Sequence, residues 1–375
     1  MKEIRALTGI RGIAALIVFL AHTREALAPR GVDLPATPLE VRLFLSGGRQ
    51  VDIFFALSGF ILALIYASWF ENGVSRASYL SFLRKRIARI YPLQAFMLAV
   101  IAGFVLVAYL SHAAVLNGLG RFSVATFVQN LLLIQAWGFS GDAGSVWNPP
   151  AWSVSIEAAA YLVFPFFLWS TATARERRPW LLLLGALACG FTLNLFSFWG
   201  QTGFSGLSRG LSEFALGIIV AALFNTGTAD WLRSNLGSCL ALLLLVVCFA
   251  LTPDTGFAIA ACAAPLLLAL SGKNYVSGFF GSTPIYFLGE ISYSVYLGHF
   301  LYTSIAYRIV STNWMRTGPL PTAIGVTFIV ALVLGLSTLT YYAVERPGRD
   351  WLSGRRKRVP AREPESQARP GRSIV

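Results

Sequence analysis

The chain has 375 residues, of which 56% are hydrophobic and 13% charged, and its formal net charge is +13. A soluble domain carries about 25% charged residues, so this composition argues against a soluble domain and favours a chain that lies in lipid. The excess of basic residues could suggest nucleic acid. These residues stand beside the ends of apolar runs and in the C-terminal tail, however, which is the pattern of membrane topology, and we expect no nucleic-acid partner.

Ten apolar runs approach the length of about 20 residues that a helix needs to cross a bilayer core of roughly 30 Å. They cover residues 9–28, 51–70, 90–111, 152–170, 180–199, 207–225, 234–252, 256–271, 285–309 and 321–344. The run 256–271 is the least secure of them. We predict an all-α, polytopic membrane protein with about ten transmembrane helices.

Lysine and arginine in the short loops predict the orientation of these helices, because basic loops stay on the cytoplasmic side. Lys2 and Arg5 place the N-terminus in the cytoplasm. The C-terminus and the other basic loops then fall on the same side, at residues 76–89, 175–178, 233 and 273. This agreement requires that residues 122–137 do not cross, so we predict a re-entrant or interfacial segment there.

We expect one transmembrane domain over residues 1–350, followed by a basic tail at 351–375. The tail is rich in Arg, Pro, Glu and Ser and cannot bury a core, so we predict that it is disordered and cytoplasmic. The four cysteines lie in apolar runs without metal-ligand or redox spacing, and no metal site is expected.

Two ionisable residues stand in the first run, where charge at membrane depth is costly and therefore marks a candidate functional residue. Arg11 and His22 are eleven residues apart, so they share one face of a helix about 16 Å apart along its axis. Arg11 then lies near the cytoplasmic surface and His22 in the outer half. Arg11 could instead be an interfacial anchor, and His22 a partner in an interhelical hydrogen bond. Histidine is nevertheless the natural general base near neutral pH.

Four more ionisable residues are expected in the outer half of the membrane: Asp52, Glu157, Arg209 and Glu213. Each has a structural alternative. Asp52 could cap its helix, Glu157 could pair with an arginine, and Arg209 with Glu213 could form a self-contained i,i+4 ion pair.

At the inner face, Arg86 and Arg89 are three residues apart on a helix that leads into the membrane. Such a cluster often reports only topology, but with Arg11 these two residues could form a clamp for phosphate groups. The ninth run adds His299 at mid-depth.

Several motifs in order resemble bacterial acyltransferase family 3, the membrane-bound O-acyltransferases that act on surface polysaccharides, lipopolysaccharide and some secondary metabolites. The resemblance covers about residues 4–350. It is carried by Arg11 and His22 at Arg-x10-His spacing and by the segments VDIFFALSGF, RKRIARIYP, PPAWSVSIEAAAYLVFP, SRGLSEFALG and GEISYSVYLGHF.

The resemblance implies ten spans in the bacterial inner (plasma) membrane, cytoplasmic acyl-CoA as co-substrate, with acetyl-CoA as the default, and transfer to a hydroxyl on the outer side. It carries the critical Arg and His onto Arg11 and His22, and a Trp-Ser-Leu-x-x-Glu element onto Trp152, Ser153 and Glu157. The chain departs from the family's pattern with Val154 for the usual Leu and with alanine at positions 158 and 160. These departures bear on which acceptor fits.

The resulting hypothesis is an O-acyltransferase in which Arg11, Arg86 and Arg89 bind the phosphates of acyl-CoA. His22 is the general base, and Asp52 or Glu157 orients it. The expected acceptor is a carbohydrate or glycolipid, with membrane lipid and glycan-assembly proteins as further partners. The residues expected to bind the acceptor are Trp152, Ser153, Arg209, Glu213 and His299.

Three alternatives stay open. A covalent acyl-His or acyl-Ser intermediate is a variant of the same chemistry. The polar layout could also belong to a transporter or flippase of a glycolipid or small anion, or to a membrane scaffold without catalytic function.

Overall fold

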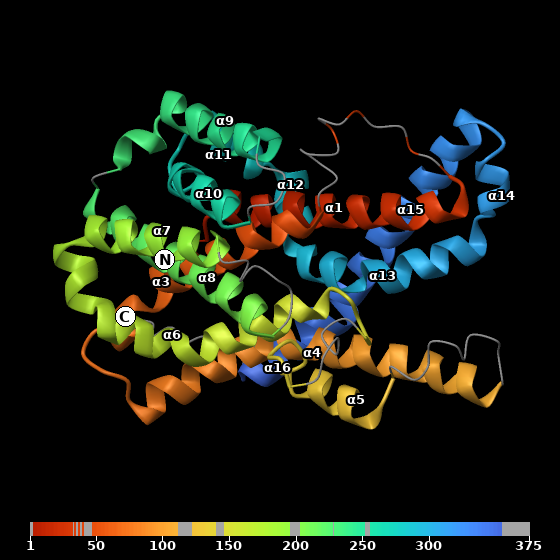
Figure 1. Cartoon of the computed structure of the whole chain (residues 1–375), viewed down its shortest axis with the longest axis horizontal. Coiled ribbons are helices and arrows are strands. Elements are labelled where there is room, and N and C mark those ends of the chain that lie inside the picture. Colours follow the sequence, from red (N-terminus) through yellow and green to blue (C-terminus); the bar gives the residue numbers. More distant parts are fainter. Residues whose placement is uncertain are drawn as a thin grey trace, which may run out of the picture.

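The computed structural model describes residues 3–32, 47–111, 122–139, 146–195, 203–227, 229–251 and 256–354, together with residues 34, 37 and 40. Every regular element in these ranges is a helix (Figure 1). Most of the predicted tail, from residue 355 onward, lies outside the described part of the chain. The elements are α1 (Arg5–Leu27), η1 (Ala28–Arg30), η2 (Gly47–Arg49), α3 (Gln50–Phe70), α4 (Arg76–Leu110), α5 (Val124–Leu131), α6 (Ala151–Arg177), α7 (Pro179–Leu195), α8 (Gly203–Thr226), η5 (Asp230–Arg233), α9 (Asn235–Leu251), α10 (Gly256–Leu270), α11 (Tyr275–Phe280), α12 (Thr283–Glu290), α13 (Ser292–Ile309), α14 (Thr312–Met315), α15 (Pro319–Thr340), η6 (Tyr341–Glu345) and α16 (Arg346–Ser353).

Within the described ranges, six helical segments are long and apolar enough to cross a membrane, so the chain is a multi-pass membrane protein. Each corresponds to one of the predicted spans. The segments are Arg5–Arg30, Gln50–Phe70, Arg76–Leu110, Ala151–Arg177, Gly203–Thr226 and Pro319–Ser353.

The other four predicted spans differ from these six in length or continuity. Three are shorter apolar helices, namely Pro179–Leu193, Asn235–Leu251 and Phe257–Leu270. The run 285–309 is divided between α12 and α13, because Ile291 ends one helix and precedes the next. Six of the ten predicted spans therefore coincide with helices that are long and apolar enough to cross a membrane. The other four spans stay predictions, as does the side of the membrane on which the termini lie.

The segment 122–137 contains only the eight-residue helix α5, which is followed by turns. A helix of this length covers about 12 Å, which is too short to cross a bilayer. Whether the segment is re-entrant or interfacial stays a prediction.

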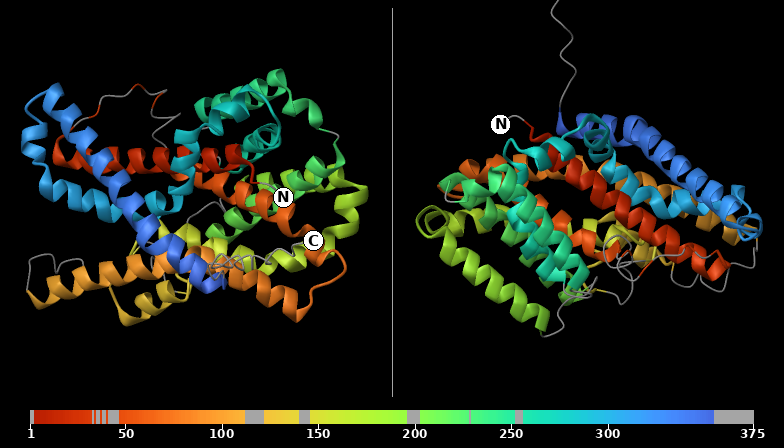
Figure 2. Two further views of the ribbon diagram at one scale, coloured as in Figure 1. Left: turned by 180° about the vertical axis from the view of Figure 1, so that it is seen from behind. Right: turned by 90° about the horizontal axis from the view of Figure 1, so that it is seen from above.

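The long helices lie side by side in one bundle, with α1 in contact with α3, α12 and α13 (Figures 1 and 2). Helix α3 also packs closely against α8, because glycines stand where the two backbones meet. A Cβ on Gly59 would lie 2.0 Å from the carbonyl oxygen of Phe214, and one on Gly217 would lie 1.9 Å from that of Ala56. This close contact fixes the position of the α3 side chains that line the site.

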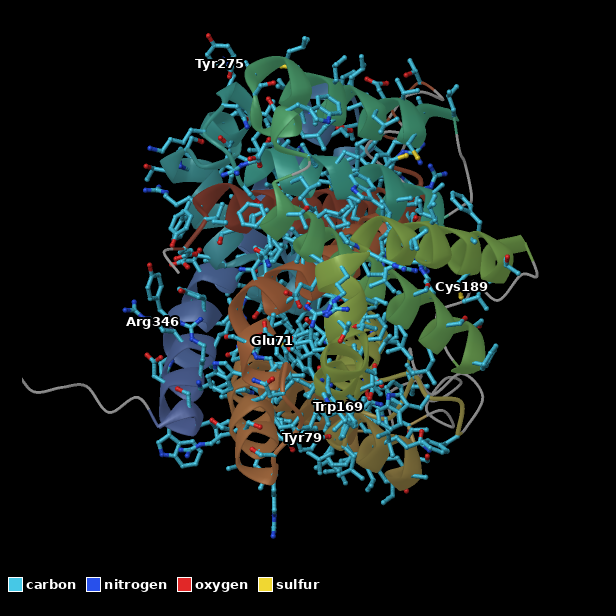
Figure 3. All side chains as sticks on the ribbon, turned by 90° about the vertical axis from the view of Figure 1, so that its left-hand side faces the viewer. Glu71, Tyr79, Trp169, Cys189, Tyr275 and Arg346 are labelled. Atoms are coloured by element: carbon cyan, nitrogen blue, oxygen red, sulfur yellow. The ribbon has the colours of Figure 1, made fainter. Side chains whose placement is uncertain are left out.

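Burial separates central helices from peripheral ones. In α1, α6 and α8, 67% of the apolar window is buried, whereas in the α4 and Pro319–Ser353 windows only 22% is buried. The exposed side chains of these two peripheral segments include large apolar groups such as Phe104, Leu110 and Leu320. Figure 3 shows the side chains that project from the bundle all round its surface. Such exposed apolar surface fits contact with lipid.

Candidate active site

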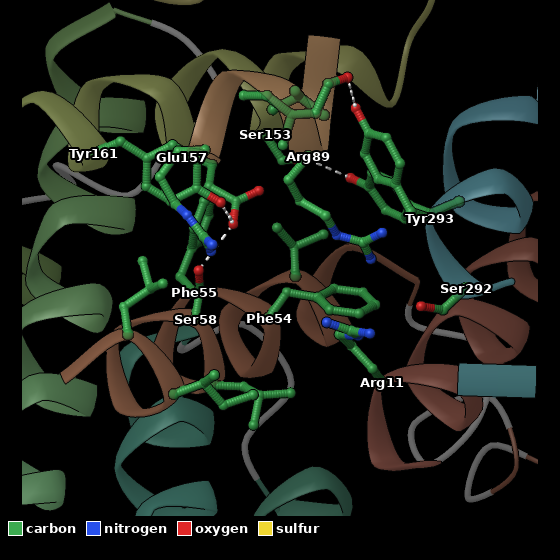
Figure 4. Close-up of a pocket in the computed structure, with 18 residues that line it drawn as sticks. Arg11, Phe54, Phe55, Ser58, Arg89, Ser153, Glu157, Tyr161, Ser292 and Tyr293 are labelled. Atoms are coloured by element: carbon green, nitrogen blue, oxygen red, sulfur yellow. Dashed lines mark hydrogen bonds between the residues drawn. The ribbon is translucent and has the colours of Figure 1, made fainter. Parts of the chain in front are cut away.

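A pocket lies between α1, α3, α4, α6 and α13 (Figure 4). On α3 its lining runs from Val51 to Leu62, eleven residues apart, or about 16 Å along the helix axis. It is lined by Arg11, Val51, Phe54, Phe55, Leu57, Ser58, Ile61, Leu62, Arg86, Arg89, Ile90, Ser153, Val154, Glu157, Tyr161, Ser292, Tyr293 and Tyr296. Five predicted site residues therefore meet in one space: Arg11, Arg86, Arg89, Ser153 and Glu157.

The three arginines give the pocket a cationic character. Arg11 donates to the carbonyl oxygen of Gly289 at 3.4 Å, and Arg86 donates to the hydroxyl of Tyr66 at 3.2 Å. The Nε groups of Arg11 and Arg86 are buried and have no hydrogen-bond partner. Because buried polar groups are normally satisfied, these two donors fit an anionic ligand that completes them.

Arg89 is held by Glu345, whose side chain is 1% exposed and lies 2.5 Å from the guanidinium. Glu345 also accepts a hydrogen bond from Ser294 at 2.8 Å. It is the last residue of the π-helical turn η6, and π-helical turns occur frequently at functional sites. The contact joins the end of the Pro319–Ser353 segment to the pocket wall.

A second pocket adjoins the first and shares Arg11, Ile61 and Arg89 with it. The second pocket begins beside the start of α1, at Glu3 and Thr8, and is also lined by Glu290 and Arg349. The two pockets thus follow one another from the N-terminal end of α1 into the bundle, and Arg11 and Arg89 line both of them.

Glu157 is the acceptor of a small hydroxyl cluster opposite Arg11 and Arg89 (Figure 4). Its Oε1 atom accepts from Tyr161 at 2.6 Å and from Ser58 at 2.8 Å. Tyr161 is four residues after Glu157 on α6, so this bond could have been inferred from helical spacing. Ser58 comes from α3, and no local sequence signal pointed to it as a partner of Glu157.

Tyr296 lines the pocket, and its hydroxyl lies 2.8 Å from Ser153 Oγ. The carbonyl oxygen of Tyr296 accepts from His299 Nδ1 at 2.6 Å, and His299 Nε2 lies 3.1 Å from His22 Nδ1. His22 and His299 are not among the lining residues, so His299 stands one hydrogen-bonded step beyond the lining residue Tyr296, and His22 stands two steps beyond it.

The structure brings neither Asp52 nor Glu157, the two carboxylates that we expected to orient the imidazole, into a hydrogen bond with His22. Glu157 is engaged by Ser58 and Tyr161, and Asp52 is bonded to Arg209 at 2.6 Å. The imidazole of His22 is instead bonded to His299, a residue that we had predicted to bind the acceptor.

Asp52, Arg209 and Glu213 form a buried cluster beside the pocket. Arg209 lies 2.6 Å from Asp52 and 4.0 Å from Glu213, so the predicted i,i+4 pair is the weaker of its two ion pairs. The guanidinium also lies 5.4 Å from the ring centroid of Trp152. None of these four residues is among those that line the pocket, and the roles that we expected for them stay predictions.

The described residues contain no group of three or more His, Cys, Asp or Glu side chains that could hold a metal ion. The polar groups of the pocket are guanidinium, carboxylate and hydroxyl groups. These groups suit the binding of an anionic substrate and the transfer of protons.

Comparison with known proteins agrees with this chemistry. An acyltransferase of Streptomyces mycarofaciens, MdmB, is 29% identical over 97% of this chain and 96% of its own length. A protein of Staphylococcus aureus (strain COL) that is named as an O-acetyltransferase is 21% identical over 93% of this chain, which spans 58% of that protein. No solved structure matches the chain.

The family comparison covers nearly the whole bundle. The acyltransferase domain of family 3 matches residues 4–342, from the start of α1 to η6. This range includes Arg11, the whole lining of the main pocket and the His22–His299 pair. The chain therefore belongs to acyltransferase family 3 and is an acyltransferase.

Proposed function

We propose that this enzyme transfers an acyl group, in the simplest case acetyl, from acyl-CoA to a hydroxyl of a carbohydrate or glycolipid in the bacterial inner membrane. The observation that carries the proposal is the convergence of Arg11, Arg86 and Arg89 on a pocket that extends about 16 Å along α3. This length matches the axial distance of about 16 Å between Arg11 and His22 on α1.

The arginines and the elongated lining of the pocket support acyl-CoA as the donor. Its phosphates bind to the arginines, because guanidinium groups form paired, charge-assisted hydrogen bonds with phosphate oxygens. The adjoining pocket, which also contains Arg349, leaves room for the rest of the nucleotide. The narrow pantetheine arm then extends along α3, so that the thioester lies toward Ser153 and Tyr296.

His22 acts as the general base for the transfer. It takes the proton of the acceptor hydroxyl as the hydroxyl oxygen attacks the thioester carbonyl. The new ester bond forms, the carbon–sulfur bond breaks, and the CoA sulfur leaves as a thiolate that is protonated to the thiol. Glu157 lies within the pocket and positions Ser58 and Tyr161 beside the arm of the donor.

The acceptor is the less defined substrate. A relative named as an O-acetyltransferase supports a hydroxyl acceptor and an acetyl group. A polar acceptor such as a sugar chain would approach from the His22 end, opposite the entrance beside Glu3 and Arg349. Glycan-assembly proteins would supply such an acceptor at the membrane.

The proposal is tested with the purified full chain in lipid nanodiscs, incubated with radiolabelled acetyl-CoA and with lipid-linked or soluble glycan acceptors. We expect protein-dependent acylation of the acceptor, together with slow hydrolysis of the thioester when the acceptor is left out. If acetyl-CoA, succinyl-CoA and longer acyl-CoA thioesters are neither cleaved nor transferred, acyl-CoA is not the donor.

A cellular experiment identifies the acceptor. Mass analysis of surface glycans from cells with and without the protein is expected to show a loss of acyl ester groups in the absence of the protein. Transport of a glycolipid without chemistry would instead change the amount of surface glycan and leave its acyl content unchanged.

A further inference from the structure

We propose that His299 is a positioning residue that fixes the tautomer of His22 and leaves His22 Nε2 free to accept a proton. The inference rests on the proposed role of His22 as general base. It gives His299 a function that differs from contact with the acceptor.

Two hydrogen bonds connect Tyr296, His299 and His22 in series. His299 Nδ1 lies 2.6 Å from the carbonyl oxygen of Tyr296, three residues earlier on α13. His299 Nε2 lies 3.1 Å from His22 Nδ1 on α1. The two rings are inclined by only 15°, and their centroids are 5.1 Å apart. Nearly parallel planes at this separation fit two rings bonded edge to edge through facing nitrogens.

The position of the hydrogen on each histidine follows from the carbonyl oxygen of Tyr296, the first member of the series. A carbonyl oxygen only accepts, so His299 Nδ1 carries a hydrogen. In a neutral ring the other nitrogen is then an acceptor, and His299 Nε2 must receive its hydrogen bond from His22 Nδ1. His22 therefore carries its hydrogen on Nδ1, and its Nε2 holds the free lone pair that a general base needs.

The surroundings of His299 favour the neutral ring that this argument requires. Its side chain is 1% exposed and lies among the rings of Phe19, Tyr296 and Phe300. An unpaired charge is costly in such a place. When His22 takes a proton, its Nδ1–H still donates to a neutral acceptor, so the imidazolium is stabilised without movement of either ring.

The same series connects the base to the donor pocket. The side chain of Tyr296 lines the pocket and contacts Ser153, while its carbonyl oxygen holds His299. Short helix α12 precedes α13, and the backbone of α12 approaches α1 closely at Gly12. The register between α1 and α13 thus sets the distance between the two histidines.

Three substitutions at one position separate this role from a structural one. In His299→Gln the amide oxygen can still accept from His22 Nδ1. In His299→Asn the shorter amide keeps a donor for the Tyr296 carbonyl but does not reach His22. In His299→Leu both bonds are lost. We measure kcat and the KM for acetyl-CoA in nanodiscs, with His22→Ala as the reference for loss of the base.

We expect His299→Gln to retain kcat within about tenfold of the wild-type value. We expect kcat to fall by about 100-fold or more in His299→Asn and His299→Leu, because both substitutions remove the support for general-base catalysis. The KM for acetyl-CoA should change less than threefold in all three. If His299→Asn is active and His299→Gln is not, only the bond to the Tyr296 carbonyl matters, and the inference is overturned. Full activity of His299→Leu would overturn it as well.

A spectroscopic measurement does not depend on turnover. The chain has three histidines, so ¹⁵N-histidine labelling gives few signals to assign. We expect His22 of the wild-type protein to be protonated on Nδ1, and to become a mixture of tautomers in His299→Asn. A His22 that is protonated on Nε2 in the wild type would refute the inference, whereas activity of His22→Ala would refute the proposed base and leave the tautomer result intact.

Discussion

The two ends of α1 have opposite surroundings. At the Arg11 end the helix borders two adjoining pockets that contain three further arginines, Arg86, Arg89 and Arg349. At the His22 end the imidazole packs against His299 and Phe300 and lies outside the lining of the main pocket. Under the proposed function, one end holds the anionic donor and the other performs proton transfer, so substitutions should affect either donor affinity or the rate of the chemical step.

The largest expected effect is that of His22→Ala. Loss of the base should lower kcat by about 100-fold to 10,000-fold, because general-base catalysis contributes about this much. The KM for acetyl-CoA and insertion into the membrane should be preserved. Steady-state kinetics of the purified variant and membrane fractionation measure these quantities. A kcat near the wild-type value would remove His22 from the mechanism.

Arg11→Lys tests the Arg11 end of α1, where the proposed function places the donor. Lysine keeps the positive charge but cannot form paired hydrogen bonds with phosphate, so we expect the KM for acetyl-CoA to rise about tenfold or more with little change in kcat. Arg308→Lys is the matched control, because Arg308 is exposed near the end of α13 and lines neither pocket. An equal rise of KM for the acceptor would contradict assignment of Arg11 to the donor.

Gly12→Ala tests how the Arg11 end is positioned. A Cβ at this residue would lie 2.5 Å from the backbone nitrogen of Gly289, whose carbonyl oxygen accepts from Arg11. We expect a stability loss of about 1–3 kcal/mol from overpacking, seen as a lower Tm, and a higher KM for the donor. Gly103→Ala on α4 is the control, since nothing lies within 4 Å of its Cβ position. A Tm equal to that of the control would show that α1 and α12 can separate freely.

The smallest effect is expected for Ser153→Ala. The change removes the 2.8 Å hydrogen bond to the Tyr296 hydroxyl, which is worth about 0.5–1.5 kcal/mol, so kcat should fall by no more than about tenfold. Ser304→Ala, at an exposed serine of α13 bonded to the Phe300 carbonyl, is the matched control. A loss as large as that of His22→Ala would indicate that Ser153 itself takes part in the chemistry.

The sequence was enough to predict several of the residues that lie in the pocket, but not which residues they contact. Arg11, Arg86, Arg89 and Glu157 were predicted from their depth and helical spacing, and the structure places them in one pocket. Their partners could not be predicted in the same way. Arg89 and Glu345 are 256 residues apart, and His22 and His299 are 277 residues apart. Helical periodicity gives the face of one helix, whereas these contacts depend on which helices become neighbours.

The apolar runs in the sequence were sufficient to predict the helical class of the fold. Apolar runs identify helices, but a run does not reveal an internal break such as the one at Ile291 between α12 and α13. The break is relevant to the site, because Ser292, Tyr293 and Tyr296 follow directly after it and line the pocket. The π-helical turn that ends at Glu345 had no recognisable sequence signal.

Arg11 and Arg89 line both pockets, so each pocket is bordered by the same two guanidinium groups. A hollow that extends deep into a membrane protein could conduct ions and dissipate the membrane potential. Fixed guanidinium charges at a constriction oppose the passage of protons and metal cations, as they do in selective pores. Under the proposed function, the guanidinium groups that attract the polyanionic donor would also oppose a leak of cations through the enzyme.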